Sequence, residues 1–516
     1  MVTEREWREA SDMRQSRVTL LLILLVAGGL RFWGIDAGIP FSPQVDEPEL
    51  MERSVRMMRT GDFNPHFFDY PGLYIHLQMV VAVLRFLFGA TVGEWSSLAE
   101  TSTFDFYLWG RALTALLGTA TVLVLYHIGM RWGTRYAALG SGLLAVMPMH
   151  VRESHFVLTD VPVAFFVALA WLMALRAHEQ PRLASFAIAG VAAGLAAATK
   201  YPGAIAIFVA LAAVWMTQAV RPSRIVAALV VCLSALVAFL VAAPYTVLDL
   251  PGFLNGYAKL AGYYSGNPPP EPVWLTYLKH LRIGLAWPGF LLALAGLVLA
   301  IVRSIKGTGR VRWALIVIFP VLYFLFVSRQ TLAFGRYLMP LVPFACLLAS
   351  IAVVSGVSLL RRFDIPRTAR TALVATLTVA AILPPALQSV NFDISLNQRG
   401  TIELAYDWIL ENIPRGSKVA IETQQLLLPP NAYQSVNMPR LVADHRSLGE
   451  HQAYVDKGFQ YIVSSSAGFG RSIARPDSFP AEYEAYMKLF TLSQELVRFT
   501  PDKDHPGPEL RILRLK

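Results

Sequence analysis

Long runs of apolar residues recur along the 516-residue chain, separated by short polar segments. A helix that crosses a membrane needs roughly 20 mostly apolar residues. By this measure about eleven runs predict membrane-spanning helices, near residues 18–38, 108–130, 136–149, 161–176, 184–199, 203–219, 225–245, 284–302, 312–328, 338–360 and 371–390. The pattern therefore predicts a polytopic α-helical membrane protein.

The apolar run at residues 71–89 does not fit this series. If it crossed the bilayer, every later basic loop would change sides, and Arg85 would lie in hydrocarbon at a cost of several kcal/mol. We therefore expect a helix that lies at the outer interface or re-enters it.

Arginine and lysine cluster in alternate connections between the apolar runs. The clusters occur near residues 131–135, 176–182, 221–224, 303–312 and 361–370, and Arg14 and Arg17 precede the first run. Basic loops mark the cytoplasmic side of a membrane protein. The first run ends in Arg31-Phe32-Trp33 rather than at a small-residue cleavage site, so we expect it to be a retained span. The first outer loop, residues 39–107, and everything after residue 390 are then extracytoplasmic.

The pattern changes after residue 390. Residues 401–414, "TIELAYDWILENIP", have the period of an amphipathic helix, and "SKVAIE", "QYIVSS" and "LRILRL" resemble strands. We expect residues 391–516 to form a small extracytoplasmic α/β domain, and residues 1–390 to form the transmembrane module, with interfacial helices in its first outer loop.

Composition agrees with a membrane protein. Hydrophobic residues make up 55% of the chain and charged residues 16%, and the mean hydropathy is +0.47. The net charge of +10 comes from short clusters between apolar runs, which argues against nucleic-acid binding. Cys232 and Cys346 both lie inside apolar runs, so we expect neither a disulfide framework nor a thiolate metal site.

Ionisable side chains gather at the expected outer ends of the apolar runs. Such residues near hydrocarbon often mark functional sites in membrane proteins. Acids facing bases around a cavity suit a transfer reaction with an anionic leaving group. The candidate acids are Asp46, Glu47 and Asp160, the candidate cations are Lys200, Arg329 and Arg336, and the flanking candidates are Tyr70, Tyr74, His155, Tyr201 and Tyr337.

The order of these features resembles the GT-C membrane glycosyltransferases, in particular the protein O-mannosyltransferase and lipid A aminoarabinose transferase group. The resemblance rests on "DE" at 46–47, then "FDYPGLYIHL", "RALTALLGTATVLVLYHIGMRWG", "ESHFVLTD", the lysine at 200 and "RYLMPLVP". It implies a sugar donor linked to polyprenyl phosphate and transfer at the outer face of the cell membrane. The acceptor would be a hydroxyl of a protein, lipid or glycan.

The resemblance also implies roles for single residues. Asp46 matches the general base that removes the acceptor proton with inversion at the sugar carbon. Glu47 matches a second acid that acts as a hydrogen-bonding partner or contacts a metal, so a divalent metal stays open. Asp160 matches the second-loop acid, and Lys200, Arg336 and Tyr337 match contacts to the phosphate.

One position departs from the family pattern. The aminoarabinose enzymes carry a lysine before a double proline, whereas this chain has Asp69 before "YPGLY". The departure leaves open which group of the first outer loop contacts the phosphate.

Ordinary structural roles remain open for the same residues. Asp46 or Glu47 could cap a helix, and either Thr159 or Asp160 could cap another. Lys200 and Arg336 could extend to lipid headgroups, the tyrosines could form an aromatic belt, and His155 could be an interfacial hydrogen-bonding residue. Residues 263–272, "YYSGNPPPEP", read as a loop and, as a hypothesis, as a lid.

Two other function classes compete with sugar transfer. A transporter or flippase would also carry charged residues near a cavity, but it would often show internal repeats and charges near the membrane midplane. The chain shows no clear repeat, and its charges collect at one face. An inactive relative would lack the first-loop acid, which is present as Asp46.

Overall fold

The computed structural model describes residues 4–39, 46–218, 223–265, 271–306, 309–360, 366–423, 426–429, 431–437 and 451–515. The chain divides into two compact units. Unit 1 comprises Met1–Ile35 and Glu49–Phe392, and unit 2 comprises Asp36–Pro48 and Asp393–Lys516. The loop hypothesis for residues 263–272 falls partly on residues 266–270, outside the described residues.

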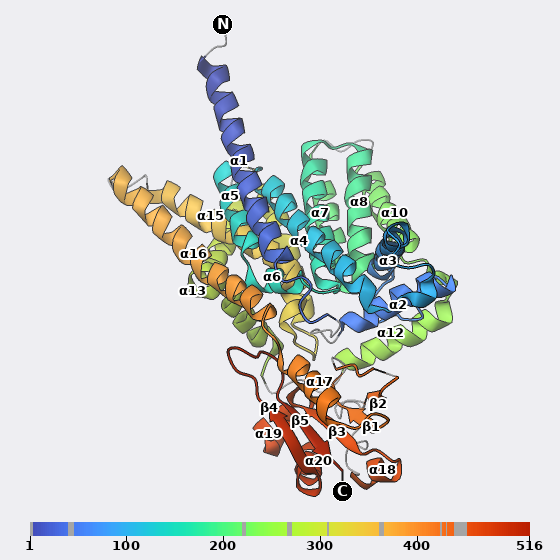
Figure 1. Ribbon diagram of the computed structural model, residues 1–516. Coiled ribbons are helices and arrows are strands. Elements are labelled where there is room, and N and C mark those ends of the chain that lie inside the picture. The colour runs from blue at the N-terminus through green and yellow to red at the C-terminus, as the bar shows by residue number, and fades with distance from the viewer. Residues whose placement is uncertain are drawn as a thin grey trace. The chain divides into compact units, whose positions relative to one another are not determined.

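Unit 1 consists of helices (Figure 1). The helices up to residue 216 are α1 (Glu4–Phe32), α2 (Glu47–Thr60), α3 (Leu73–Thr91), α4 (Tyr107–Gly129), α5 (Thr134–Ala145), α6 (Pro148–Glu153), α7 (Asp160–Glu179), α8 (Leu183–Thr199) and α9 (Ile207–Met216). The later ones are α10 (Arg224–Ala242), α11 (Tyr245–Leu248), α12 (Leu250–Tyr264), α13 (Val273–Lys306), α14 (Arg310–Val327), α15 (Val342–Leu360) and α16 (Arg367–Leu396). Short 3-10 helices are η1 (Leu98–Glu100), η2 (Phe104–Phe106), η3 (Tyr201–Ala206) and η4 (Gly335–Leu341).

Among the described residues, 9 helices are long and apolar enough to cross a membrane. The predicted class of polytopic helical membrane protein is confirmed, although the expected spans differ in detail. The run at 136–149 forms α5, whose 12 residues reach only about 18 Å at 1.5 Å per residue, short of a bilayer core of about 30 Å. The runs at 184–199 and 203–219 form shorter apolar helices, Leu183–Thr199 and Tyr201–Met216.

Helix α3 also differs from the expectation for its run. We expected residues 71–89 to lie at the membrane interface because of the charge pattern. By length and composition α3 belongs among the 9 helices that could cross a membrane. Arg85, which the charge argument placed in hydrocarbon, pairs with Glu94 at 2.7 Å.

Helix α7 lies beside α8 and also contacts α4 and α9 (Figure 1). It is apolar around its whole circumference, as expected for a helix surrounded by other helices. Its Trp171 stacks on Phe344 of α15 with ring centroids 4.2 Å apart, and Phe344 stacks on Phe319 of α14 at 5.0 Å. These aromatic contacts join α7 to α14 and α15, which lie far from it in the sequence, and they help to fix the helices around the candidate site.

Helices α8 and α10 pack closely because α8 consists largely of alanine and glycine. A Cβ atom at Gly194 would collide with the backbone carbonyl of Ala235, and one at Gly190 with that of Val231. Small residues allow this close approach of helix backbones. The packing holds the end of α8, and with it Lys200, in a defined place.

Unit 2 is a small α/β domain. It contains α17 (Thr401–Asn412), β1 (Lys418–Ile421), β2 (Gln434–Asn437), α18 (His451–Asp456), β3 (Tyr461–Ser465), α19 (Ser466–Ala474), η5 (Pro476–Ser478), α20 (Pro480–Leu492), β4 (Gln494–Phe499) and β5 (Leu510–Arg514). The sheet order is β2-β1-β3-β5-β4. Strand β1 runs parallel to β2 and β3, and β5 runs antiparallel to β3 and β4.

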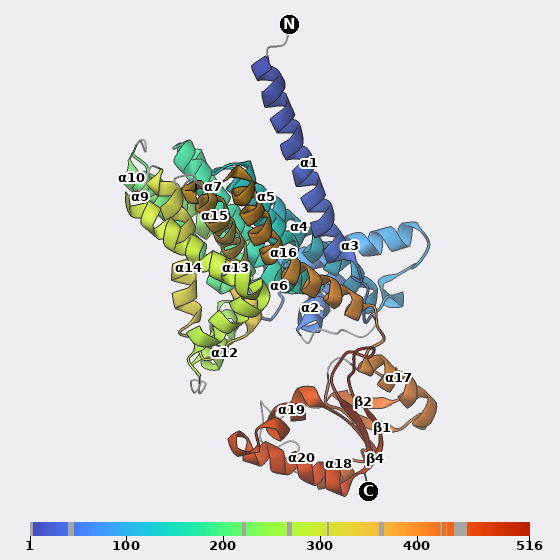
Figure 2. The same ribbon diagram turned by 90° about the vertical axis from the view of Figure 1, so that its left-hand side faces the viewer.

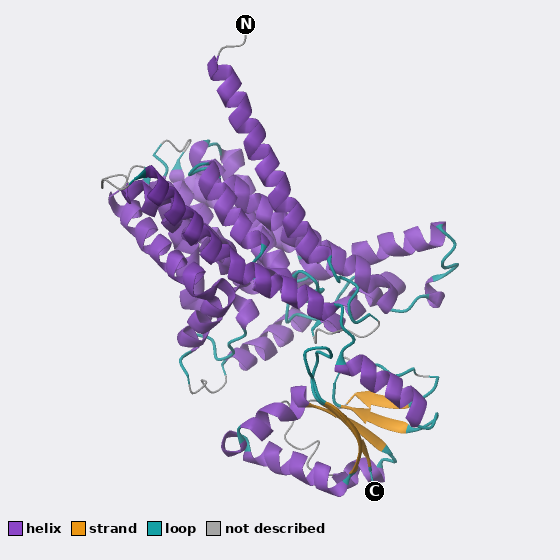
Figure 3. Cartoon of the chain, turned by 60° about the vertical axis from the view of Figure 1, so that its left-hand side comes forward, coloured by secondary structure: helices purple, strands orange, loops and turns teal. Residues whose placement is uncertain are grey.

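Helices cover both faces of this sheet (Figures 2 and 3). Alternate strand residues point to opposite faces: Val419 and Ile421 pack in the cluster with α17, whereas Ala420 packs in the cluster with α19 and α20. The predicted helix and the three predicted strands are confirmed as α17, β1, β3 and β5. The sequence did not predict strands β2 and β4. Both lie at the edges of the sheet, and their sequences, "QSVN" and "QELVRF", are partly polar.

Candidate functional site

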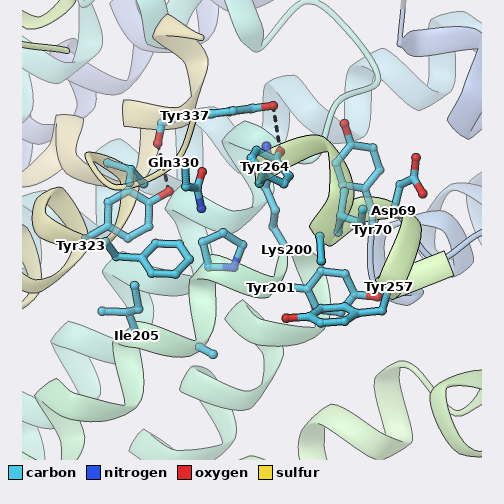
Figure 4. Close-up of a pocket in the computed structure, with 16 residues that line it drawn as sticks. Asp69, Tyr70, Lys200, Tyr201, Ile205, Tyr257, Tyr264, Tyr323, Gln330 and Tyr337 are labelled. Carbon is cyan, nitrogen blue, oxygen red and sulfur yellow. Dashed lines mark hydrogen bonds between the residues drawn. The ribbon is translucent and has the colours of Figure 1, made fainter. Parts of the chain in front are cut away.

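A cavity of about 290 Å³ lies in unit 1 and is lined by residues of η3, α12, α14 and η4 and of the segment before α3 (Figure 4). A volume near 300 Å³ is at the lower end of ordinary ligand pockets. Nine of its lining residues are polar, and six of these are tyrosines: Asp69, Tyr70, Lys200, Tyr201, Tyr257, Tyr264, Tyr323, Gln330 and Tyr337. Apolar residues, including Ile205, Leu260, Phe326 and Val327, complete the wall. The lining suits a ligand that has both polar and apolar parts.

Lys200 forms a buried ion pair with Asp160. The Nζ atom of Lys200 lies 2.7 Å from Oδ1 of Asp160, and the two residues are 8% and 2% exposed. Lys200 follows the last residue of α8 in extended conformation, with φ −154° and ψ 130°, so the chain leaves the helix at this residue. Asp160 is the first residue of α7, where the helix dipole stabilises a carboxylate.

Tyrosines surround the ammonium group of Lys200. Its Nζ lies 4.9 Å from the ring centroid of Tyr337 and 5.6 Å from that of Tyr70, within the range of cation–π attraction. The Tyr264 hydroxyl donates to the Tyr337 hydroxyl at 2.9 Å, and the Tyr323 hydroxyl donates to the Tyr337 backbone carbonyl at 2.9 Å. The cation is therefore held by a carboxylate and faces the cavity with its aromatic neighbours.

Two further acids lie near this cation. Glu153, at the end of α6, is 1% exposed, and burial raises the pKa of its carboxyl group, with the charge of Asp160 adding to the increase. Asp69 is the one carboxylate among the described residues that line the cavity. Burial raises its pKa too, and Lys259 and Arg53 partly offset the increase. Lys200 and Asp69 line the cavity, and Glu153 lies among the charges near Lys200. Acids with raised pKa values beside a cation at a cavity are typical of a functional site.

The first part of the chain matches a known family. Residues 51–265 match the family model described as "Dolichyl-phosphate-mannose-protein mannosyltransferase". No curated protein matches the chain.

Solved structures show the same fold. The apo oligosaccharyltransferase of Archaeoglobus fulgidus aligns with a TM-score of 0.58 at 14% identity, over 87% of this chain and 69% of that chain. Apo ArnT from Cupriavidus metallidurans aligns with a TM-score of 0.55 at 16% identity, over 98% of both chains. ArnT bound to undecaprenyl phosphate aligns with a TM-score of 0.51 at 14% identity, over 98% of both. The chain therefore has the GT-C fold of these solved structures, and its residues 51–265 match the mannosyltransferase family model.

The cavity contains four of the residues proposed from the sequence, Tyr70, Lys200, Tyr201 and Tyr337. Asp160 joins them through its ion pair with Lys200. Thr159, the N-cap residue of α7, makes no side-chain capping bond, and the Asp160 carboxylate binds Lys200. The carboxylate of Asp160 therefore forms a salt bridge to Lys200 and does not act as a helix cap.

Other residues proposed from the sequence lie outside the cavity lining. Tyr74 is buried and bonds to Thr114 and Gln78. The ring nitrogens of His155 face the carbonyls of Val151 and Trp33, at 2.9 and 3.0 Å. These contacts place both side chains in the packing of unit 1, and their roles in substrate binding stay predictions.

The two proposed arginines differ in exposure. Arg329 is exposed, whereas Arg336 is partly buried and stacks over the Phe334 ring at 5.6 Å. Arg336 directly precedes Tyr337 in η4, and its charge lowers the pKa of Glu153. Arg336 is therefore part of the charged surroundings of the Lys200–Asp160 pair, although it does not line the cavity.

The two first-loop acids lie at the start of helix α2. Asp46 precedes the helix and is partly buried, and Glu47 is its first residue and is buried. Among the described residues, no group of three His, Cys, Asp or Glu side chains is arranged to hold a metal ion. The catalytic role of Asp46 and the role of Glu47 stay predictions.

Sequence reasoning missed several residues that line the cavity. Tyr257 and Tyr264 lie on α12, which carries no motif, and Tyr323 and Gln330 lie on or just after α14. A tyrosine inside an apolar run is usually assigned to packing or to an aromatic belt. One signal was available for Glu153, because it opens the "ESHFVLTD" segment that ends at Asp160.

Proposed function

We propose that the enzyme transfers a sugar from a polyprenyl-phosphate donor to an acceptor hydroxyl on the extracytoplasmic face of the cell membrane. The observation that carries this proposal is the buried Lys200–Asp160 pair at the wall of a cavity lined by tyrosines and apolar side chains. A lipid-linked sugar phosphate has one anionic group between a polar head and an apolar tail. The cavity offers a cation, hydroxyl groups and apolar surface for these three parts.

The donor carries its own activation. The bond between the anomeric carbon and the phosphate oxygen breaks, and a bond from the acceptor oxygen to that carbon forms. The electron pair of the broken bond stays on the phosphate. The acceptor proton passes to Asp46, which acts as the general base, and attack from the opposite side inverts the sugar carbon. The chain has no GxxxxGK[ST] loop, and this reaction needs no nucleotide.

Fixed positive charge would stabilise the leaving phosphate. Such charge acts more strongly in a water-poor site than in bulk water. We assign this role to Lys200, with Arg336 and Tyr337 of η4 beside it, while Asp160 holds Lys200 in place. The exposed Arg329 would meet the donor only at the rim of the site.

Two relatives support a polyprenyl-phosphate donor. ArnT from Cupriavidus metallidurans was solved with undecaprenyl phosphate, and the Archaeoglobus fulgidus oligosaccharyltransferase AglB with an inhibitory peptide and a dolichol-phosphate. The distribution of basic loops supports an extracytoplasmic site, because the loops that carry the candidate residues are the ones poor in basic clusters.

The test measures transfer from labelled polyprenyl-phosphate sugars in membranes that contain the full chain. Asp46→Asn should lower the rate at least about 100-fold, the usual contribution of a general base. Glu49→Gln is the matched control, since Glu49 lies in the same loop and pairs with Arg53 at 2.6 Å. If the Asp46→Asn protein is present at normal abundance and transfers sugar near the wild-type rate, Asp46 is not the general base.

A further inference from the structure

Glu153 is a buried carboxyl group that the proposed reaction does not use. It ends the short helix α6, and its side chain is 2% exposed. Its Oε1 lies 3.1 Å from Nε of the neighbouring Arg152, whose side chain is 56% exposed. No described residue donates a hydrogen bond to its Oε2, which is fully buried. A charged carboxylate in such surroundings is costly, because a buried charge needs hydrogen-bonding partners.

The charges around Glu153 come from the elements that pack against α6. Helix α7 contributes Asp160 and η4 contributes Arg336, while Lys200 follows α8. Helix α1 contributes Arg31, but Arg31 bonds to His150 of α6 at 3.0 Å and to backbone carbonyls. Glu153 therefore shares one group of charges with the candidate phosphate site.

The charge balance of this group depends on the proton of Glu153. With Glu153 ionised, its carboxylate adds a second negative charge beside Asp160, which counters the nearby cations Lys200, Arg336 and Arg152. With Glu153 protonated, the group is more positive by one unit, which favours the negative charge of a phosphodiester. Burial and the nearby Asp160 both raise the pKa of Glu153 and so favour the protonated form.

We propose that Glu153 is a positioning residue that stays uncharged behind Asp160, so that Lys200 and Arg336 keep a net positive charge for the donor phosphate. This inference rests on the proposed function. Glu153 acts through the neighbouring charges and does not contact the reacting atoms. Donor affinity is then highest at pH values where Glu153 holds its proton, and it falls as the proton leaves.

The probe for this inference is the monomethyl ester of undecaprenyl phosphate, a phosphodiester whose single charge is constant between about pH 5 and pH 8.5. Binding is measured to the full chain in nanodiscs over this range. The wild-type dissociation constant should rise on the order of tenfold with pH as a buried charge appears near the phosphate. Glu153→Gln mimics the protonated side chain and should bind tightly with no such rise.

Two further variants sharpen the result. Glu153→Met removes the charge with a similar side-chain volume and should also abolish the rise, which covers the case in which glutamine disturbs folding. Glu94→Gln is the control, because Glu94 pairs with Arg85 and is exposed, and it should keep the wild-type rise. A pH-dependent rise that persists in both Glu153 variants, or a flat wild-type profile, would overturn the role of Glu153. Failure of all proteins to bind the ester would overturn the polyprenyl-phosphate donor itself.

Discussion

The Nζ atom of Lys200 lies 2.7 Å from Oδ1 of Asp160, although the two residues are 40 positions apart and lie at the ends of different helices. The α7–α8 hairpin brings them together, since the end of α8 returns to the start of α7. Both side chains are buried, so each charge depends on the other. This ion pair therefore joins the ends of two packed helices at the wall of the candidate site.

Breaking this pair should destabilise the protein strongly. Lys200→Met leaves Asp160 as a buried carboxylate without its cation, and loss of one partner of a buried pair costs about 3–5 kcal/mol. The double variant Lys200→Met/Asp160→Asn should recover much of this loss while transfer stays abolished. Unfolding of the purified protein in mixed micelles measures both effects.

The control is the ion pair between Arg131 and Glu179, in which Nε lies 3.0 Å from Oε1. Both side chains of this pair are partly exposed. Glu179→Gln should cost less than about 1 kcal/mol, as surface pairs do. Equal losses for Lys200→Met and Glu179→Gln would contradict the importance assigned to the buried pair.

Tyr264→Phe should weaken donor binding. The Tyr264 hydroxyl donates to Tyr337, whose ring lies against Lys200. Loss of one such bond is worth about 1 kcal/mol, so the donor KM should rise about fivefold. The neighbouring Tyr263 is 51% exposed, and Tyr263→Phe should leave KM unchanged. If both variants have the same donor KM, Tyr264 does not contribute to donor binding.

Gly194→Ala should loosen the contact between α8 and α10. The added methyl group would collide with the carbonyl of Ala235, and overpacking costs about 1–3 kcal/mol. At Gly142 in α5 a Cβ atom meets nothing within 4 Å, so Gly142→Ala should be neutral or stabilise the helix by up to about 1 kcal/mol. Thermal unfolding of the two variants should therefore shift in opposite directions, and a shift of the same sign and size would contradict the close packing.

Asp69→Asn should change how stability depends on pH. Burial raises the pKa of Asp69 in the folded state, so ionisation of Asp69 favours the unfolded chain. The contribution of Asp69 to stability is fully present below the pKa that an aspartate has in the unfolded chain, near 3.9. This contribution is lost as pH rises through the higher pKa that Asp69 has in the folded state. Relative to wild type, Asp69→Asn should gain stability across this acid range and keep the gain at neutral pH.

Asp62 provides a control of opposite sign for Asp69. A hydrogen bond from His66 lowers the pKa of Asp62 in the folded state. The contribution of Asp62 to stability is therefore present above the pKa of an aspartate in the unfolded chain, and it is lost as pH falls through the lower pKa of the folded state. Asp62→Asn should therefore lose stability at neutral pH relative to wild type. Unfolding temperatures of both variants between about pH 3.5 and pH 7 provide the measurement, and a fall in stability for Asp69→Asn at neutral pH would contradict the assignment.

The sequence by itself determined the membrane class and the helical module, and its motifs led to the resemblance to the GT-C glycosyltransferases. Apolar runs of spanning length are a local property, and so are the helix and the three strands of the C-terminal domain that were expected correctly. Residues such as Asp160 and Lys200 were visible because charges next to hydrocarbon are costly and need a reason.

Only the tertiary structure decided which of the candidate residues meet. Tyr74 and His155 have the same sequence setting as Tyr70 and Tyr201, but their polar atoms bond to buried neighbours within unit 1. Tyr257, Tyr264 and Tyr323 carry no motif and still line the cavity, because the packing of α12 and α14 brings them there. The charge state of Glu153 likewise depends on burial and on charges from α7, α8 and η4. Such contacts join segments far apart in the chain, and no local pattern encodes them.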